Sequence, residues 1–175
     1  MTAEHRDWDF SRLVEEHFSR AVRFCARMLG NVNDGEEVAQ QAFVSLYEKG
    51  SKPWEKGDPL PFLFRVLRNA CVDHVRRAKV RRAKVRRAEG ELEQAHARTD
   101  LSRAEEGEIR EALLGALGAL EEGQREVVLL RYFEELSLKE TADAVGKTVG
   151  ATAMLLSRAK QHLKETLGKL PEFGE

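Results

Sequence analysis

The sequence lacks the features that would place this protein in a membrane or in a secretory pathway. No apolar run in its 175 residues approaches the roughly 18 residues of a membrane span, so we expect no membrane insertion. The N-terminus carries mixed charges and no apolar core, so it does not resemble a signal peptide and a cytoplasmic location is expected. Its two cysteines, Cys25 and Cys71, are too few for a metal-binding motif and are expected to be buried, reduced thiols.

The sequence also lacks the residue patterns that carry enzymatic chemistry. It contains no recognisable nucleophile–base pair, paired carboxylates, metal-ligand cluster or glycine-rich phosphate loop. We therefore expect a protein that is not an enzyme and that needs no cofactor.

The formal net charge of −1 conceals a strong segregation of charge along the chain. Residues 73–88 carry eight basic side chains and one acidic, whereas residues 89–111 carry three basic and eight acidic. The basic block repeats a five-residue unit, and five helical steps rotate each copy by about 140°, so no face of the helix stays apolar. A solvated helix end is the plainer interpretation, but such a concentration of cations favours contact with nucleic acid.

The spacing of apolar residues predicts helices along most of the chain. Steps of three and four recur over residues 10–29, 38–47, 63–75, 112–120, 127–133 and 149–167. Asp34 and Glu37 have the spacing of a helix N-cap residue and the acid at the third position of that helix. Pro61 suits the first turn of a third helix. Gly123 is expected to separate the helix over residues 112–120 from the one that begins at residue 127.

Between these helices, residues 89–108 are acidic and almost free of large apolar side chains, which is typical of a flexible linker. The predicted fold class is therefore all-α, with two small helical domains, residues 1–88 and 109–175, joined by this flexible acidic linker.

The C-terminal domain contains the pattern of a helix-turn-helix. Ser137 and Glu140 form a predicted capping box, Gly146 suits a left-handed helix stop, and Thr148 can cap the next helix. A short helix, a glycine turn and a longer second helix form this motif, whose second helix usually enters the major groove of DNA. Along that second helix the inward face is predicted to begin at Val149 and to include either Thr152 or Ala153.

Three segments together resemble the sigma-70 family of bacterial transcription factors, and their order and two-module length resemble its extracytoplasmic-function (ECF) group. Residues 34–47, DGEEVAQQAFVSLY, resemble the helix that binds core RNA polymerase. Residues 62–77, FLFRVLRNACVDHVRR, resemble the promoter-melting helix. Residues 120–167, with QREVVLLRY at 124–132, resemble the C-terminal domain that docks on the upstream promoter element.

The resemblance implies an alternative sigma factor that binds core RNA polymerase and directs promoter recognition and DNA melting. Residues 1–88 then form the region 2 domain, and residues 109–175 form the region 4 domain. The family usually has an acid where Gln41 stands, so one charge-assisted contact with the polymerase is expected to be weaker here. The implied polymerase-binding residues are Glu36, Glu37, Gln40 and Gln41.

For promoter melting, the resemblance implies cations on the DNA backbone with aromatic or polar side chains around an unstacked base. Two of these residues have a structural alternative: Trp54 folded back on the core, and Asp73 paired internally with Arg76 or Arg77. The implied promoter-melting residues are Lys52, Trp54, Lys56, Arg65, Arg68, Asn69, Asp73, Arg76 and Arg77.

The helix-turn-helix departs most from the family, which commonly has Lys where Ala153 stands and Arg where Leu155 stands. Arg reads guanine edges, whereas Ala, Met and Leu contact at best thymine methyl groups, so direct readout should be weak or tuned to A·T-rich sequence and DNA shape. The implied DNA-binding residues of this domain are Lys139, Thr148, Gly150, Ala151, Met154, Leu155 and Arg158.

This mostly apolar outward face leaves a second function open. A sigma-like regulatory protein could bind a protein co-regulator through its C-terminal module instead of upstream DNA. An ordinary helix-turn-helix repressor fits poorly, because it leaves residues 34–77 without a role. The expected partners are core RNA polymerase, promoter DNA and an anti-sigma factor or co-regulator, by which similar proteins are often controlled.

Overall fold

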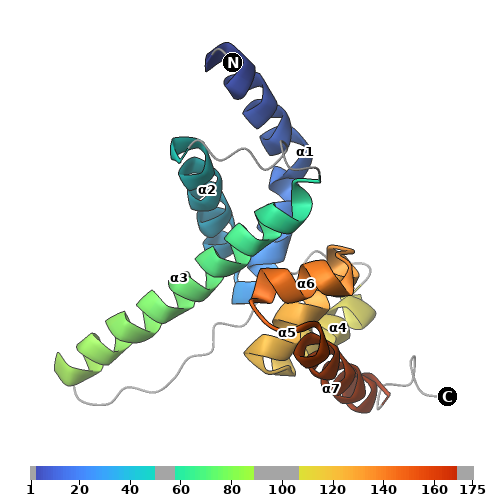
Figure 1. Ribbon diagram of the computed structural model, residues 1–175. Coiled ribbons are helices and arrows are strands. Elements are labelled where there is room, and N and C mark those ends of the chain that lie inside the picture. The colour runs from blue at the N-terminus through green and yellow to red at the C-terminus, as the bar shows by residue number, and fades with distance from the viewer. Residues whose placement is uncertain (1–2, 50–57, 89–106, 169–175) are drawn as a thin grey trace. The chain divides into compact units, whose positions relative to one another are not determined.

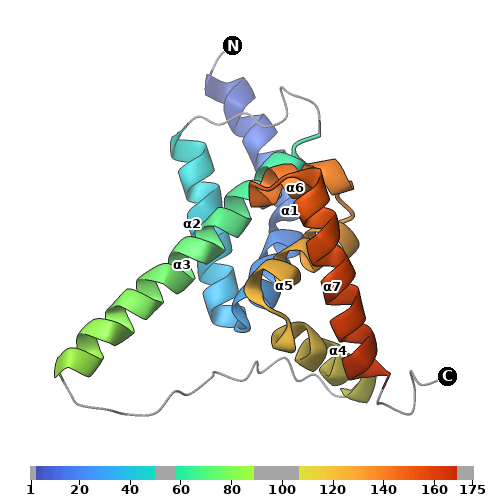
Figure 2. The ribbon, with the colours of Figure 1, turned by 60° about the horizontal axis from the view of Figure 1, so that its bottom comes forward.

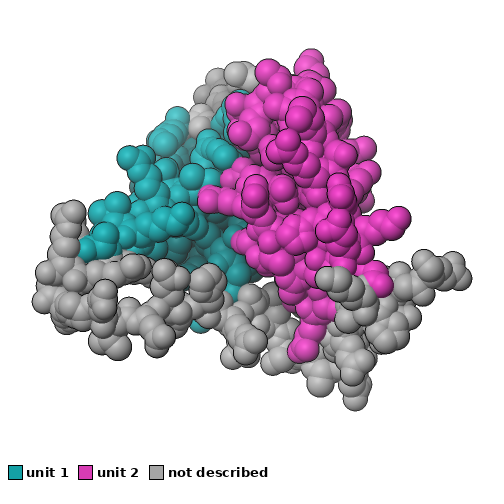
Figure 3. Space-filling view, turned by 90° about the horizontal axis from the view of Figure 1, so that it is seen from below, with its two compact units in different colours: residues 1–99 teal, residues 100–175 magenta. Residues whose placement is uncertain are grey.

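The computed structural model describes residues 3–49, 58–88 and 107–168, and every regular element in these ranges is a helix (Figure 1). The chain divides into two compact units, Met1–Thr99 and Asp100–Glu175 (Figure 3). The predicted all-α fold with two small helical domains is confirmed, while the predicted linker falls mostly on residues 89–106, outside the described ranges. Among the described helices, none is both long and apolar enough to cross a membrane.

The first unit consists of three helices. They are α1 (Ala3–Leu29), α2 (Val32–Glu48) and α3 (Leu60–Ala88). The α1–α2 contact is the most extensive in the described chain, and α3 packs on both helices (Figures 1 and 2). Gly30 makes the tight turn between α1 and α2 at a φ of 73°, a backbone conformation that glycine adopts without steric cost.

The start of α2 lies before the predicted cap. Asn31 is the N-cap: its backbone is extended and its side-chain oxygen accepts a hydrogen bond from the Asp34 backbone N–H at 3.0 Å. The prediction of an Asp34 cap was therefore wrong, since Asp34 lies in the first turn, where its negative charge favours the helix dipole. Asn31 caps the helix because it follows the Gly30 turn directly and can take an extended backbone.

Aromatic pairs join the three helices of the first unit. Phe10 and Phe18 of α1 pack against Phe43 of α2 at ring-centroid distances of 6.3 and 5.7 Å. Phe24 of α1 meets Phe64 of α3 edge to face at 5.1 Å. Each such pair adds about 0.5–1.5 kcal/mol beyond the area it buries. The two cysteines are buried and are not joined in a disulfide, as the sequence predicts.

At Gly35 the backbones of α1 and α2 approach so closely that no side chain fits. A Cβ atom placed there would lie 2.5 Å from the backbone nitrogen of Ala26 and 2.7 Å from its Cα. Because the obstacle is backbone, no rotation of a side chain can relieve it. The absence of a side chain at Gly35 thus sets the distance between α1 and α2.

The second unit packs four α-helices and one π-helical turn. These are α4 (Gly107–Ala119), α5 (Glu122–Val128), the π-helix η2 (Leu129–Phe133), α6 (Leu138–Val145) and α7 (Val149–Leu167). α4, α5 and α6 all pack on α7. The break after α4 falls at Leu120 and Glu121, so the predicted interruption at Gly123 was wrong and Gly123 lies inside α5.

Arg125 closes the C-terminal end of α4. Its guanidinium donates hydrogen bonds to the carbonyl oxygens of Leu117, Gly118 and Leu120 at 3.0, 2.8 and 3.2 Å. Carbonyls at the end of a helix lack partners within the helix, and the planar fork of an arginine can satisfy several at once. Burial lowers the pKa of Arg125, yet an arginine remains charged at physiological pH. Arg125 therefore stabilises the break between α4 and α5, which the sequence analysis had placed at Gly123.

We predict that Gly35→Ala destabilises the first unit. Alanine raises helix propensity by up to about 1 kcal/mol. Forcing its Cβ against the Ala26 backbone costs about 1–3 kcal/mol or more, so the net change is a loss of stability. Urea unfolding followed by tryptophan fluorescence reports on this unit, because Trp8 and Trp54 both precede residue 100.

Gly115→Ala is the matched control, since a Cβ at Gly115 of α4 meets no atom within 4 Å. Its stability, followed by far-UV circular dichroism, should equal or exceed that of the unaltered chain. Equal unfolding midpoints for Gly35→Ala and the unaltered chain would contradict the close approach.

Candidate functional site

The four predicted polymerase-binding residues lie together on the exposed face of α2. The Gln40 side-chain amide donates to Glu36 at 3.4 Å, and the Gln41 amide donates to Glu37 at 2.9 Å, each one helical turn apart. Val44 continues the row of Glu36 and Gln40 and is 56% exposed, although its apolar side chain gives it no reason to face water. The sequence analysis missed Val44. The face thus presents acids, amides and one apolar side chain.

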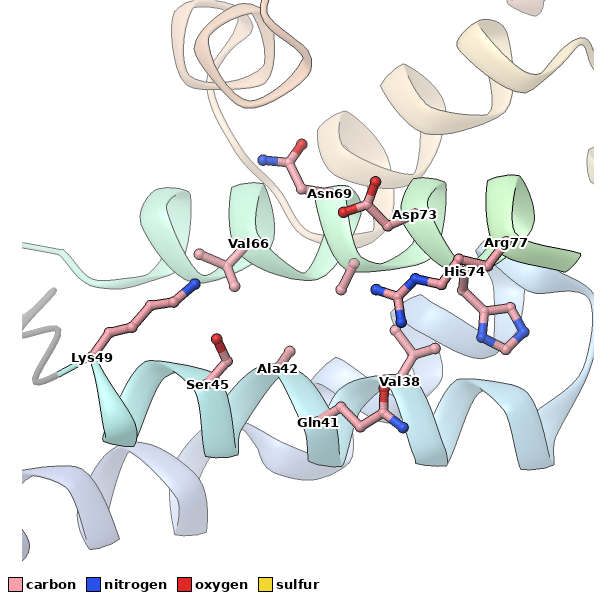
Figure 4. A pocket seen from close by; sticks show the side chains of 11 residues that line it. Val38, Gln41, Ala42, Ser45, Lys49, Val66, Asn69, Asp73, His74 and Arg77 are labelled. Carbon is pink, nitrogen blue, oxygen red and sulfur yellow. The ribbon is translucent and has the colours of Figure 1, made fainter. Parts of the chain in front are cut away.

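A groove between α2 and α3 brings together residues from both predicted site sets (Figure 4). Its volume is about 450 Å³, and it joins Gln41 from the polymerase-binding set to promoter-melting residues of α3. Lys49, Ser45 and His74 also line it and were not predicted, because sequence spacing within one helix does not reveal which residues face another helix. The lining residues are Val38, Gln41, Ala42, Ser45, Lys49, Val66, Asn69, Ala70, Asp73, His74 and Arg77.

The groove has a cation at each end and small apolar side chains between them. Figure 4 shows Lys49 reaching in from α2 at one end and the Arg77 guanidinium at the other, with Asn69 and Asp73 directed away from α2. No phenylalanine, tyrosine or tryptophan lines the groove, so the His74 imidazole is the only ring in its lining on which a base could stack. Its two cations can instead hold anionic groups such as phosphates or carboxylates.

His74 and Asp34 connect α3 to the first turn of α2. The His74 Nε2 and the Asp34 Oδ2 lie 3.8 Å apart, and both side chains are partly exposed. The pair forms an ion pair only when the histidine is protonated. It marks the end of the groove near Arg77, where α2 begins.

The exposed face of α3 carries most of the predicted promoter-melting residues. Residues 65, 69, 73 and 76 share one side of the helix by their spacing of three and four. The Arg65 guanidinium lies over the Phe62 ring at 5.2 Å, and Arg68 donates to the Asn69 side-chain oxygen at 3.1 Å. Within the described part of the chain, Asp73 forms no ion pair with Arg76 or Arg77, so that structural alternative has no support.

The remaining predicted residues of this set, Lys52, Trp54 and Lys56, fall on residues 50–57, outside the described ranges. Their proposed contact with an unstacked base, and the alternative of Trp54 folded on the core, stay predictions.

The helix-turn-helix has the caps that its sequence predicts. The Ser137 hydroxyl accepts a hydrogen bond from the Glu140 N–H at 3.2 Å, and the Glu140 carboxylate accepts one from the Ser137 N–H at 2.8 Å. Gly146 ends α6 in the left-handed conformation, at φ 67° and ψ 37°. Thr148 then caps α7 by accepting from the Ala151 N–H at 3.2 Å. These contacts fix the turn between the two helices.

α6 and α7 each bury a threonine whose hydroxyl bonds to the N-cap residue of its own helix. The Thr141 hydroxyl donates to the Ser137 carbonyl at 2.9 Å, and the Thr152 hydroxyl donates to the Thr148 carbonyl at 3.0 Å. Both side chains are fully buried, and these bonds remove the cost of burying an unpaired hydroxyl. Thr152, and not Ala153, therefore completes the inward face of α7.

The outward face of α7 is mostly apolar, as the sequence predicts. Met154 is 58% exposed, Ala151 and Arg158 are exposed, and Leu155 is half-buried. Val149 is 46% exposed, so the prediction that it faces inward was wrong: it stands in the first turn, ahead of the buried Thr152. Lys139 and Thr148 are exposed, and Gly150 faces open space.

The second unit also contains a tyrosine that lies between two cations, which the sequence analysis did not predict. Tyr132 is 47% exposed, with the Lys160 ammonium 5.3 Å and the Arg131 guanidinium 5.9 Å from its ring centre. Tyr132 lies in η2, where the Glu134 N–H bonds to the Leu129 carbonyl at 3.0 Å. Helical patterns of period 3.6 do not reveal such a π-turn, and π-turns are frequent at functional sites.

Family models and known proteins match both units. The model described as sigma-70 region 2 matches residues 13–81, and the model described as sigma-70, region 4 matches residues 110–163. The ECF RNA polymerase sigma factor SigM of Bacillus subtilis is 28% identical over 152 residues, which cover 87% of this chain and 91% of that protein. The ECF RNA polymerase sigma factor SigW of the same species is 26% identical over 168 residues, covering 92% and 90%.

The fold is also found among solved structures. The sigma factor RpoE of Bartonella quintana, in complex with the anti-sigma factor NepR, matches with a TM-score of 0.71 at 22% identity, covering 93% of this chain and 98% of that one. CnrH, in complex with the cytosolic domain of CnrY, matches with a TM-score of 0.61 at 24% identity, covering 92% and 88%. At these sequence identities, the comparison shows a shared fold.

The capping box predicts a stability contribution that depends on pH. Hydrogen bonding by the Ser137 side chain and backbone lowers the pKa of Glu140 below its ordinary value of 4.5. A lowered pKa in the folded state stabilises the protein above the ordinary pKa, and this contribution is lost as the pH falls through the folded value. Glu140→Gln keeps an oxygen acceptor but removes the charge, so it should cost about 0.5 kcal/mol at neutral pH.

Thermal unfolding between about pH 3 and pH 8 measures this difference, which should stay constant down to about pH 5 and then disappear. Asp143→Asn, which alters an exposed carboxylate of α6 beyond its first turn, is the control and should be neutral or slightly stabilising. A Glu140→Gln deficit that grows as the pH falls would contradict the assignment.

Proposed function

The chain belongs to the sigma-70 family, in its extracytoplasmic-function (ECF) group, and we propose how its two units divide the work of an alternative sigma factor. Such a factor binds core RNA polymerase and directs promoter recognition and DNA melting for transcription initiation. The observation that carries this function is the match of a region 2 and a region 4 model, in that order, to residues 13–81 and 110–163. We propose that the chain acts in the cytoplasm, as a regulator without enzymatic activity of its own.

The exposed face of α2 is the proposed polymerase contact. Glu36 and Glu37 supply negative charge, and Val44 supplies apolar area beside it. Charges at the edge of an interface steer association, while exposed apolar side chains gain most from burial. Gln40 and Gln41 complete the face, and their amides are already oriented by Glu36 and Glu37.

The exposed face of α3 is the proposed promoter-melting surface. Arg65 and Arg76 lie on one side of the helix with Asn69 between them, so cations for the phosphates flank an amide that can bond a base edge. Arg77 adds a cation at the end of the groove. Lys52, Trp54 and Lys56 are proposed to hold the unstacked base, which requires an aromatic surface such as the indole ring of Trp54.

The second unit is the proposed contact to the upstream promoter element. Thr148, Gly150 and Ala151 stand at the N-terminal end of α7, the part of the second helix that contacts base edges in other helix-turn-helix proteins, and Lys139 stands in α6, the helix that crosses the DNA backbone there. Because Met154 and Leu155 offer no hydrogen bonds, we propose that Arg158 and the shape of A·T-rich DNA supply most of the selectivity.

A second candidate function rests on the same face of α7. Met154, which is 58% exposed, and the half-buried Leu155 beside it form apolar area that a protein partner could cover. An anti-sigma factor or co-regulator bound there would take the place of upstream DNA. The two functions therefore differ in whether α7 binds DNA or a protein.

Transcription from fragments of the source genome tests the proposed function. Purified protein mixed with core RNA polymerase should yield transcripts from a specific set of fragments, and core polymerase alone should not. If no fragment in the library is transcribed although the protein binds core polymerase, the chain does not act as an initiation factor.

Gln41→Glu should strengthen binding to core RNA polymerase. The change adds the acid that the family usually carries, and we expect about a 3- to 10-fold tighter complex at low salt, mostly through faster association. The new like-charged pair with Glu37 costs about 0.3 kcal/mol of helix stability. Equilibrium binding to labelled core polymerase measures the effect.

The matched control is Gln161→Glu in α7. Gln161 donates to Glu165 at 3.1 Å with the same one-turn spacing, so the substitution repeats the charge change on another helix. Polymerase affinity should not respond to it. An affinity for Gln41→Glu as unchanged as that of the control would remove Gln41 from the proposed contact, and a weaker complex would contradict the expected gain from an added acid.

Ala153→Lys should raise affinity for upstream promoter DNA. Ala153 is exposed on α7, and a cation there gains a phosphate or base contact. We expect about 5- to 10-fold tighter binding at low salt and a log–log salt slope more negative by about 0.9. Duplex binding by the full chain across a salt series measures both.

Ser19→Lys, at an exposed position of α1, adds the same charge away from the helix-turn-helix and serves as the control. Identical behaviour of the two variants would show that α7 does not face DNA. That result would favour the co-regulator function.

A further inference from the structure

The last part of α3 is a helix without a packing partner in its own unit. Cys71 is the last buried residue among the α3 side chains that the structure describes, yet the helix continues to Ala88. We call residues 78–88, which follow the last promoter-melting residue of the family pattern, the basic arm. In Figures 1 and 2 the yellow-green end of α3 stands clear of α1 and α2. Lys79, Val80 and Arg81 in the arm are exposed.

The composition of the basic arm is restricted to four residue types. It contains only alanine, valine, lysine and arginine, with six cations and no acid. Like charges one turn apart, such as Arg82 and Arg86, destabilise a helix by a few tenths of a kcal/mol each. A polyanion along the arm would remove that repulsion and release its own counterions.

The arm lacks the side chains that bind unstacked bases. No phenylalanine, tyrosine or tryptophan lies in residues 65–88, and the one histidine, His74, precedes the arm, whereas proteins that hold single strands stack bases on aromatic rings. The arm also has no asparagine, glutamine, serine or threonine to bond base edges. Its five-residue repeat turns successive cations by about 140°, so they do not face a single groove. Such an array can contact the phosphates of duplex DNA but does not distinguish one base sequence from another.

We propose that the basic arm is a second DNA site: a sequence-independent contact with the phosphates of duplex DNA next to the segment that α3 melts. The inference rests on the proposed function, because it takes the face of α3 up to Arg77 to be on the promoter. Since α3 is one continuous helix, the arm extends about 16 Å beyond Arg77. That length spans about five base pairs of duplex.

Removal of two arm charges tests this site. In K79Q/R81Q, glutamine keeps the helix propensity while the two exposed cations are lost. We expect the log–log salt slope of holoenzyme binding to promoter duplex to become less negative by about one to two, at about 0.9 per lost phosphate contact. The loss should be equal on duplexes of different sequence flanking the promoter. The transcription start point should stay unchanged.

The control is R23Q/K164Q, which removes two exposed cations from α1 and α7 outside every surface assigned above. Its salt slope should match that of the unaltered chain. Circular dichroism of both variants must equal that of the unaltered chain, so that altered folding does not account for the result.

Three results would overturn the proposal. The first is a salt slope for K79Q/R81Q equal to that of the unaltered chain. The second is a loss of duplex affinity that occurs with only one flanking sequence. The third is a loss of affinity for core polymerase or for single-stranded DNA, with the affinity for duplex DNA unchanged. If the unaltered protein does not initiate at all, the proposed function fails; if it initiates and K79Q/R81Q has the original salt slope, only the arm site fails.

Discussion

At Gly35, α2 approaches α1 so closely that a Cβ atom would lie 2.5 Å from the Ala26 backbone nitrogen, and the geometry of the first unit follows from this approach. It brings Phe43 of α2 within reach of Phe10 and Phe18 of α1. It also fixes the rotation of α2, so that Glu36 and Glu37 face outward. The buried Val38 and Ala42 contribute instead to the groove beside α3. One helix thereby carries the proposed polymerase contact on its exposed side and forms one wall of the groove.

The two units differ in how they can hold DNA. In the first unit, we propose that cations along α3 and its basic arm provide affinity that does not depend on base sequence. In the second, caps at Ser137 and Thr148 fix the helix-turn-helix, but α7 has Ala153 and Leu155 at the two positions where the resemblance leads one to expect Lys and Arg. The overall charge of −1 hides this division, because the acids of residues 89–111 offset the cations of α3.

Local signals predicted local structure well. The capping box at Ser137, the left-handed stop at Gly146 and the cap at Thr148 each depend on residues within four positions, and all three were confirmed. The Asn31 cap was missed because Asp34 offered an equally good pattern. The groove, the Gly35 contact and the exposed Val44 depend on how helices pack against each other, which periodicity within one helix cannot reveal.

The central claim is that α3 opens promoter DNA when the chain is bound to core RNA polymerase. Permanganate modification of unpaired thymines measures strand opening directly on a promoter selected from the genomic fragments. The account predicts reactive thymines over a short segment with the unaltered chain, and loss of reactivity with R65A/N69A even when that variant still binds core polymerase. Full reactivity with R65A/N69A, or none with the unaltered holoenzyme on any transcribed promoter, would contradict it.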